Sequence, residues 1–484
     1  MTSAPEARVL ETVGRQAAAA LADIRAAIRQ PSVSRTGEGL QAMADWVTAY
    51  VAGLGATVRQ VPGQKAPIVD GVLGSDPALP TLLLYDLYDV QPAAGQPGWS
   101  APPFAASIIA DPDGRDRLIG RGAFNSKGPL VGTLATLRCF QQAGVPIPCN
   151  LRFLFEGEEE IGSPSLPGYI DANRAALAAC DAAFIPYFGT NTRGETVLRL
   201  GFKGLALLEF RVEGGDWGGP ARGDIHALHG ALVASPAWEL VRALATLLDG
   251  QGRFAPDGLA ALMPRPDAAD LALVAAEAAR FDPARHAADL GTARLARDAP
   301  SAELLAEWMF ACTLNIDALS SGRIETGPGG DDAATLIPRT ARCFADLRVV
   351  PGLSPDAVLG LIRAHLDRRG FRHVQARLRS AYPASRAATD APVVRALIDA
   401  CRQHAGDLRV LPIHPGAAPM YVFSEMIGIP YAFGGVGHGG GAHGPDEYIM
   451  VDDIAPFMRS ITSFLFRFGA ARNENRGRMQ CSSR

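Results

Sequence analysis

Hydrophobic and polar residues follow two different periods along the first 200 positions, and together they predict an α/β fold. Residues 7–29, 43–55 and 125–144 have apolar positions at helical spacing, and the last two segments end at a glycine. Short, almost continuous apolar runs at 81–90 and 150–160 predict buried strands. Because strand and helix alternate, we expect a mostly parallel sheet lying between helices.

The pattern changes after about residue 200. Segments 202–214 and 340–352 alternate as strands do, and Ala- and Leu-rich helices are predicted at 237–249, 267–280 and 355–370. From about residue 381 the first pattern returns and continues to a helix at 454–468. We therefore predict one α/β domain built from residues 1–200 and 381–484, with an α+β domain inserted at 201–380.

Size, charge and cysteine content narrow the class of protein. A chain of 484 residues exceeds what one core usually organises. The net charge of −4 and the lack of a basic stretch argue against a nucleic-acid partner. No apolar run approaches the ~20 residues of a membrane span, and no signal peptide is recognisable. The seven cysteines are scattered and predict buried free thiols, so we expect a cytoplasmic protein.

Acidic residues gather where two of the predicted strands end. Asp89 closes the first run, and Glu158, Glu159 and Glu160 close the second. Ligands of open α/β sheets bind at the carboxyl ends of the strands. These ends are therefore the expected site, although Glu158 alone is expected to be a solvated surface charge.

Four segments, at 82–92, 118–129, 155–163 and 434–449, give the chain a family resemblance. In order and spacing they resemble the signature blocks of the zinc-dependent aminoacylase and carnosinase-type dipeptidase family, and the blocks at 224–230 and 335–351 agree. The resemblance implies a catalytic domain with an inserted lid and dimerisation domain. It also implies a small-molecule substrate and a homodimer formed through the lid.

The resemblance implies five zinc-ligand positions, and three of them are replaced here. Leu87, Asn125 and Tyr187 stand where the family has ligands, whereas Glu160 and His443 are kept. Leucine has no lone pair, an amide is neutral, and zinc sites need at least three protein ligands. We therefore expect no metal cofactor. A weak or single zinc, recruiting Asp89 or His438, is the alternative.

The acid–base residues that the resemblance implies are kept. Glu159 matches the catalytic base, and His226, Thr335 and Arg348 match residues that bind the reacting carbonyl of the substrate. The resemblance implies that the histidine comes from the partner subunit. It also implies that segment 413–419 has lost the arginine and serine that hold a substrate carboxylate.

Without metal ions, clustered carboxylates repel one another, and the pKa of at least one should rise. We predict metal-independent acid–base chemistry by Glu159, Asp89, His226 and Arg348 on a small acylated or amino-acid-derived substrate, as in a biosynthetic pathway. Two alternatives stay open. One is a metallo-dipeptidase or aminoacylase with a reduced metal site, and the other is a non-catalytic pseudo-peptidase.

Overall fold

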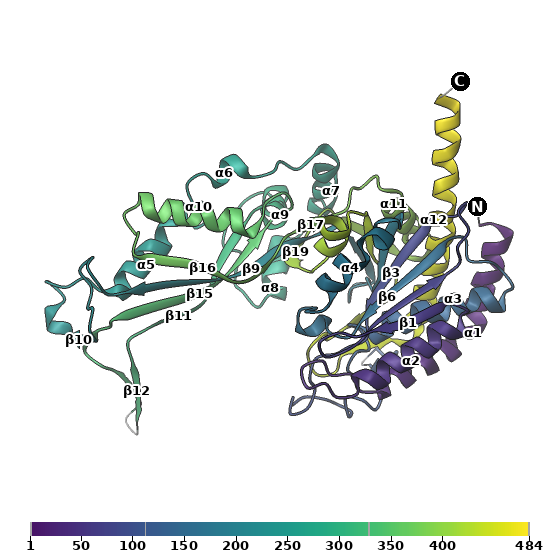
Figure 1. Ribbon diagram of the computed structural model, residues 1–484, viewed down its shortest axis with the longest axis horizontal. Coiled ribbons are helices and arrows are strands. Elements are labelled where there is room, and N and C mark those ends of the chain that lie inside the picture. The colour runs from purple at the N-terminus through teal and green to yellow at the C-terminus, as the bar shows by residue number, and fades with distance from the viewer. Residues whose placement is uncertain (1, 112, 328–329, 483–484) are drawn as a thin grey trace. The chain divides into compact units, whose positions relative to one another are not determined.

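The computed structural model describes residues 2–111, 113–327 and 330–482, which form two compact units. The first unit comprises Met1–Leu200, Ala387–Leu411 and Val422–Arg484, and the second comprises Gly201–Arg386 and Pro412–Tyr421. The elements of both units are labelled in Figure 1.

A six-stranded sheet organises the first unit. Its order is β1-β2-β6-β3-β7-β20, in which β3 is parallel to β6 and β7, β20 is parallel to β7, and β1 and β2 are antiparallel at one edge. The strands are β1 (Thr57–Val61), β2 (Ile68–Leu73), β3 (Thr81–Leu87), β6 (Asn150–Glu156), β7 (Ala182–Pro186) and β20 (Tyr431–Gly434). The predicted mostly parallel sheet is confirmed.

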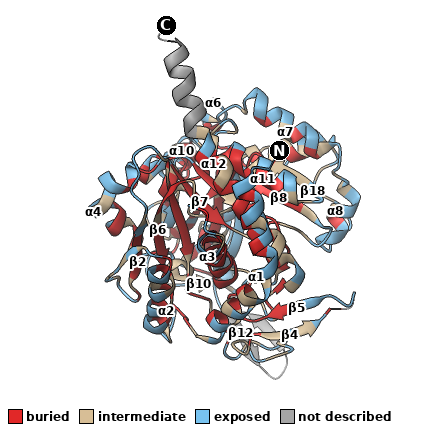
Figure 2. Ribbon diagram, turned by 90° about the vertical axis from the view of Figure 1, so that its right-hand side faces the viewer, coloured by how far each residue is buried: buried red, intermediate tan, exposed pale blue. Residues whose placement is uncertain are grey.

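Helices cover this sheet because its central strands are apolar on both sides. Figure 2 shows β6, β7 and α3 in the colour of buried residues. Helix α3 packs on β3 and β7 and contacts both α1 and α12. The helices are α1 (Ala4–Arg29), α2 (Leu40–Gly53), α3 (Lys127–Gln142), α4 (Leu166–Ala178), α11 (Pro392–His404) and α12 (Ile454–Ser482).

Two smaller sheets complete the first unit. One is antiparallel in the order β21-β22-β5-β4, and the other pairs β18 with β8 in parallel. Their strands are β4 (Ser107–Ala110), β5 (Asp116–Ile119), β21 (Gly439–Gly440), β22 (Tyr448–Met450), β8 (Glu195–Arg199) and β18 (Asp407–Leu411).

The second unit is built on an antiparallel sheet in the order β11-β15-β9-β16. Alternate residues of β15 are buried, from Ala341 to Val349, and they form one core with α5 and α10. The main strands are β9 (Gly201–Glu213), β11 (Thr313–Ser321), β15 (Thr340–Val349) and β16 (Val374–Tyr382); shorter ones are β10 (Ile225–His226), β12 (Ile324–Gly327), β13 (Gly330–Ala333) and β14 (Leu336–Ile337). The helices are α5 (Pro236–Thr246), α6 (Leu259–Leu262), α7 (Ala268–Ala278), α8 (Pro283–Asp289), α9 (Ser301–Phe310) and α10 (Pro355–Arg368).

The compact units divide the chain at slightly different places from the boundaries expected at 380 and 381. The second unit runs to Arg386 and includes Pro412–Tyr421, which lies in the segment 381–484 assigned to the first domain. The reason is strand pairing, since β17 (Ser385–Arg386) and β19 (His414–Ala417) both add to β9.

Two further features can be compared with the sequence. Six cysteines of the described chain are buried and free, as predicted for thiols of this kind, and Cys481 lies outside the residues whose side chains are described. Among the helices of the described segments, none has the length and apolar character needed to cross a membrane.

Candidate active site

The candidate site lies at the carboxyl ends of three parallel strands of the first unit. Asp89 follows β3, the turn η1 (Glu159–Ile161) follows β6, and Tyr187 follows β7. Asn125 precedes α3, and His443 lies in the loop between β21 and β22. The first unit therefore holds all the positions that the resemblance links to metal, at the edge where α/β sheets bind ligands.

Asp89 holds the backbone of the catalytic turn. Its carboxylate is fully buried and accepts hydrogen bonds from the backbone N–H groups of Glu159, at 3.2 Å, and Glu160, at 3.0 Å. Burial raises the pKa of Asp89 to about 7, against the opposing effect of hydrogen bonds from Ser34 and from this turn. Asp89 therefore positions Glu159 rather than offering free oxygen atoms to the cleft.

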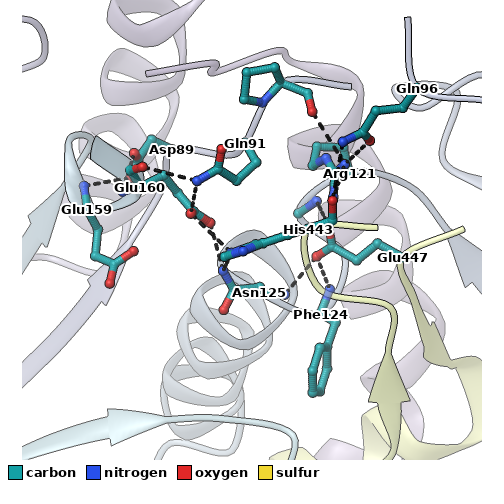
Figure 3. Close-up of polar contacts among 12 residues, drawn as sticks. Asp89, Gln91, Gln96, Arg121, Phe124, Asn125, Glu159, Glu160, His443 and Glu447 are labelled. Atoms are coloured by element: carbon teal, nitrogen blue, oxygen red, sulfur yellow. Dashed lines mark hydrogen bonds and ion pairs between the residues drawn. The ribbon is translucent and has the colours of Figure 1, made fainter. Parts of the chain in front are cut away.

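Asn125, Glu160 and His443 form a hydrogen-bonded group, called the polar cluster below (Figure 3). The amide nitrogen of Asn125 donates to Oε1 of Glu160 at 2.7 Å and lies 3.2 Å from Nε2 of His443. Oε2 of Glu160 accepts from Nε2 of Gln91 at 2.8 Å and lies 3.1 Å from Nε2 of His443. The hydrogen bond from Glu160 raises the pKa of His443, which favours an imidazolium paired with a carboxylate.

The residues present do not fit the two-zinc centre that the family resemblance implies. Leu87 has no donor atom, and the amide nitrogen of Asn125 is directed at Glu160 and His443. The ring of Tyr187 lies between Phe124, at 4.8 Å between ring centroids, and Phe433, at 5.0 Å. Within the part of the chain that the structure describes, no three His, Cys, Asp or Glu side chains are grouped so that they could hold a metal ion.

Neither residue considered for a rescued zinc site is free to ligate. Both oxygens of Asp89 accept backbone hydrogen bonds. The ring nitrogens of His438 lie 2.7 Å from the carbonyl oxygen of Thr190 and 2.9 Å from the hydroxyl of Tyr448. Recruiting either side chain would therefore break contacts that already satisfy it.

Glu159 has the electrostatic setting of an acid–base group. Burial, followed by the charges of Glu160 and Asp89, raises its pKa well above the ordinary value. Figure 3 shows that its carboxyl group makes none of the drawn contacts of the polar cluster. The direction of this shift agrees with the effect expected for carboxylates crowded together without a metal ion.

Glu447 is a structural residue of the site that the sequence did not single out. It is buried with Arg121, to which its Oε2 is bound at 2.9 Å, and it accepts the backbone N–H groups of Gly122, Phe124 and Asn125 at 2.8 to 3.0 Å. It thereby fixes the loop that presents Asn125. Its place four residues after His443, within the matching block, was the available signal.

Replacing Glu447 by alanine is expected to lower the free energy of unfolding by about 3–5 kcal/mol, because Arg121 would be left as an uncompensated buried charge. Urea denaturation measures this loss. The matched control is Glu11→Ala, which removes an exposed pair with Arg15 and should change stability little. A loss no larger than that of the control would contradict the structural role.

The expectation that Glu158 is a solvated surface charge is wrong. This side chain is 1% exposed, and it accepts backbone hydrogen bonds from Lys65, from Ala66 at 2.9 Å and from Ser165 at 3.2 Å. It joins the β1–β2 connection to the turn after β6. Sequence reasoning missed it because its partners are about 90 positions away along the chain or lie in a turn.

The three remaining candidates belong to the second unit. His226 and Thr335 are brought together, because β10 pairs with β14 and the N–H of Ala227 donates to the carbonyl oxygen of Thr335 at 3.1 Å. Arg348 lies on β15, where Asp346 binds it through two hydrogen bonds of 2.6 and 2.7 Å. Their roles toward a substrate carbonyl stay a prediction.

Comparison with known proteins identifies the scaffold. Residues 84–467 match the family described as "Peptidase family M20/M25/M40". The chain is 29% identical over 350 residues to the Cys-Gly metallodipeptidase dug1 of Schizosaccharomyces pombe, covering 67% of each protein. It is 29% identical over 217 residues to the human Beta-Ala-His dipeptidase, covering 44% of this chain and 41% of that protein.

A solved structure gives the same result for the fold. The M20 family metallo-carboxypeptidase Sso-CP2 from Sulfolobus solfataricus matches with a TM-score of 0.79 and 27% identity, over 93% of this chain and 99% of that one. The alignments to the two dipeptidases span 67% and 41% of their lengths. The predicted fold class, the family resemblance and the expectation of an enzyme scaffold are confirmed.

Proposed function

The chain belongs to peptidase family M20/M25/M40, and we propose that its cleft performs metal-independent acid–base chemistry on a small acylated or amino-acid-derived substrate. The polar cluster is the observation that carries this proposal. An amide, a carboxylate and an imidazole saturate one another where relatives of this family are named for a metal. The remaining ligand positions offer a leucine side chain and a stacked tyrosine ring.

In this mechanism Glu159 transfers the proton. Asp89 holds the backbone of its turn through two hydrogen bonds, so the position of the Glu159 carboxyl group does not depend on a metal ion. A carboxyl group whose pKa is raised can act as an acid and as a base near neutral pH. Such a transfer would serve hydrolysis, isomerisation, cyclisation or elimination. His226, Thr335 and Arg348 are proposed to bind the carbonyl group on which negative charge develops.

A metallo-dipeptidase with a reduced metal site is the second candidate. It is favoured by the pairing of Glu160 with His443, whose Oε2 and Nε2 atoms lie 3.1 Å apart. It is also favoured by the names of the relatives, which are metallodipeptidases and a metallo-carboxypeptidase. In this case Asn125 would have to turn its amide oxygen toward the ion.

Metal analysis separates the two candidates. Protein purified without added zinc is expected to contain far less than one zinc ion per chain, and its turnover should survive treatment with a chelator. Elemental analysis and a turnover assay before and after the chelator measure both quantities. Near-stoichiometric zinc, lost together with activity and restored on adding zinc back, would establish the second candidate instead.

We further propose that the second unit forms a homodimer through strand β11. This strand lies at the edge of its sheet, and its side chains Ile316 and Leu319 are 47% and 51% exposed. An exposed edge strand offers unpaired backbone groups to another chain. Apolar residues on such an edge favour a partner of the same kind.

Replacing Leu319 by aspartate is expected to convert a dimer into a monomer, because it places a charge on the proposed interface. Sedimentation velocity measures the change. Leu271→Asp on α7 is a matched control, since Leu271 is also 51% exposed and lies outside β11. A monomeric wild type, or a Leu319 variant that dimerises as the wild type does, would refute the interface.

A further inference from the structure

Arg199 is an arginine of the first unit that neither the fold nor the proposed chemistry uses. It ends β8, which runs parallel to β18 and places Arg199 opposite Leu411. The preceding residue, Leu198, packs closely on β20, where a Cβ atom added to Gly434 would lie 2.7 Å from it. Arg199 therefore stands at the carboxyl end of a strand fixed against the main sheet.

The guanidinium of Arg199 has no acidic partner among the described residues. Its one polar contact there is a 3.5 Å hydrogen bond from Nη1 to the carbonyl oxygen of Val197 in its own strand. The neighbouring acid, Glu195, is already paired with Arg409 at 2.7 Å. Burial lowers the pKa of Arg199, and the charge of Arg409 adds to this effect. A partly buried cation without a counterion is costly, and such a site favours an anionic ligand.

Tyr187 lies between this arginine and the polar cluster. Burial raises the pKa of its phenol, the charge of Arg199 lowers it, and the carboxylates of Glu447 and Glu160 raise it. Its ring is stacked on Phe433 and tilted against Phe124. The surface between Arg199 and the polar cluster is therefore aromatic, with a cation at one end and acid–base groups at the other.

We propose that Arg199 binds a free carboxylate of the substrate and that the apolar body of the substrate lies against the ring of Tyr187. This assignment rests on the proposed function and names its substrate class, an N-acylated amino acid or similar small carboxylic acid. A guanidinium matches a carboxylate through two parallel hydrogen bonds. The loss of arginine and serine from 413–419 therefore does not remove carboxylate recognition, because Arg199 supplies it from β8.

Binding of a matched pair of probes tests the assignment. N-acetylphenylalanine carries the carboxylate, and N-acetylphenylalanine amide is the same molecule without the charge. Titrations by calorimetry would use the wild type, Arg199→Met, Arg199→Lys and the control Arg15→Met, which removes an exposed arginine of α1. Glu159→Gln is included because it should stop turnover without affecting this binding.

The wild type should bind the carboxylate about tenfold or more tightly than the amide. Arg199→Met should lose this preference while binding the amide as before, and Arg199→Lys should keep part of it. Equal affinities in the wild type, binding of neither probe, or an unchanged preference in Arg199→Met would overturn the assignment. Carboxylate binding that survives in Glu159→Gln supports it whether or not Glu159 proves to be catalytic.

Discussion

Replacing Glu159 by glutamine is expected to lower the turnover number by about 10²- to 10⁴-fold, the contribution typical of a positioned acid–base group. Glutamine keeps the shape of the side chain and cannot exchange the proton. The protein should remain folded, because a neutral amide avoids burying a charge beside Glu160 and Asp89. Turnover of N-acylated amino acids and dipeptides, followed by mass spectrometry, measures the loss.

Glu38→Gln provides the control for this experiment, since Glu38 is an exposed carboxylate of the same unit. It should retain wild-type turnover, and circular dichroism should give both variants the spectrum of the wild type. Full activity of Glu159→Gln would exclude Glu159 as the proton-transfer group and leave the proposed mechanism without its central residue.

Restoring the lost ligands should produce a large gain of metal binding. The triple variant Leu87→His, Asn125→Asp, Tyr187→Asp would return three donors beside Glu160 and His443. With five donors in place, we expect about two zinc ions per chain, as in two-metal hydrolases. Elemental analysis after dialysis against zinc compares the variant with the wild type, which should bind far less.

His443→Ala added to the triple variant is the appropriate comparison, because it removes a kept donor and should lower the zinc content again. The melting temperature must be followed as well, since losing the Tyr187 ring leaves space between Phe124 and Phe433. A folded triple variant with no more zinc than the wild type would show that the identities of these three residues do not explain the poor fit to metal.

Much of the architecture was predictable because it follows from local pattern. The run that ends in Leu87 is apolar at every core position, and it forms β3. The segment predicted as a helix from 125 to 144 forms α3 over Lys127–Gln142. The start differs by two residues because Ser126 has a backbone φ of 133°, which is incompatible with a helix. The short π-helical turn at Val422–Ile427 had no recognisable pattern.

The site was predictable in its members and not in its contacts. Matching blocks placed Glu160, Asn125 and His443 at one sheet edge, but the hydrogen bonds among them join residues up to 318 positions apart. Periodicity carries no information about such pairs. For the same reason Glu158 was taken for a surface charge, and the bond between Arg348 and Asp346 went unforeseen although only two residues separate them.

The pairing of Arg121 with Glu447 has a consequence for how the protein is made. These residues are 326 positions apart, and Glu447 supplies the acceptors for three backbone N–H groups of the loop around Asn125. During synthesis the ribosome delivers the amino-terminal half of the site long before residue 447 emerges. The early half must therefore wait, with its loop amides exposed to water, for the last tenth of the chain to complete it.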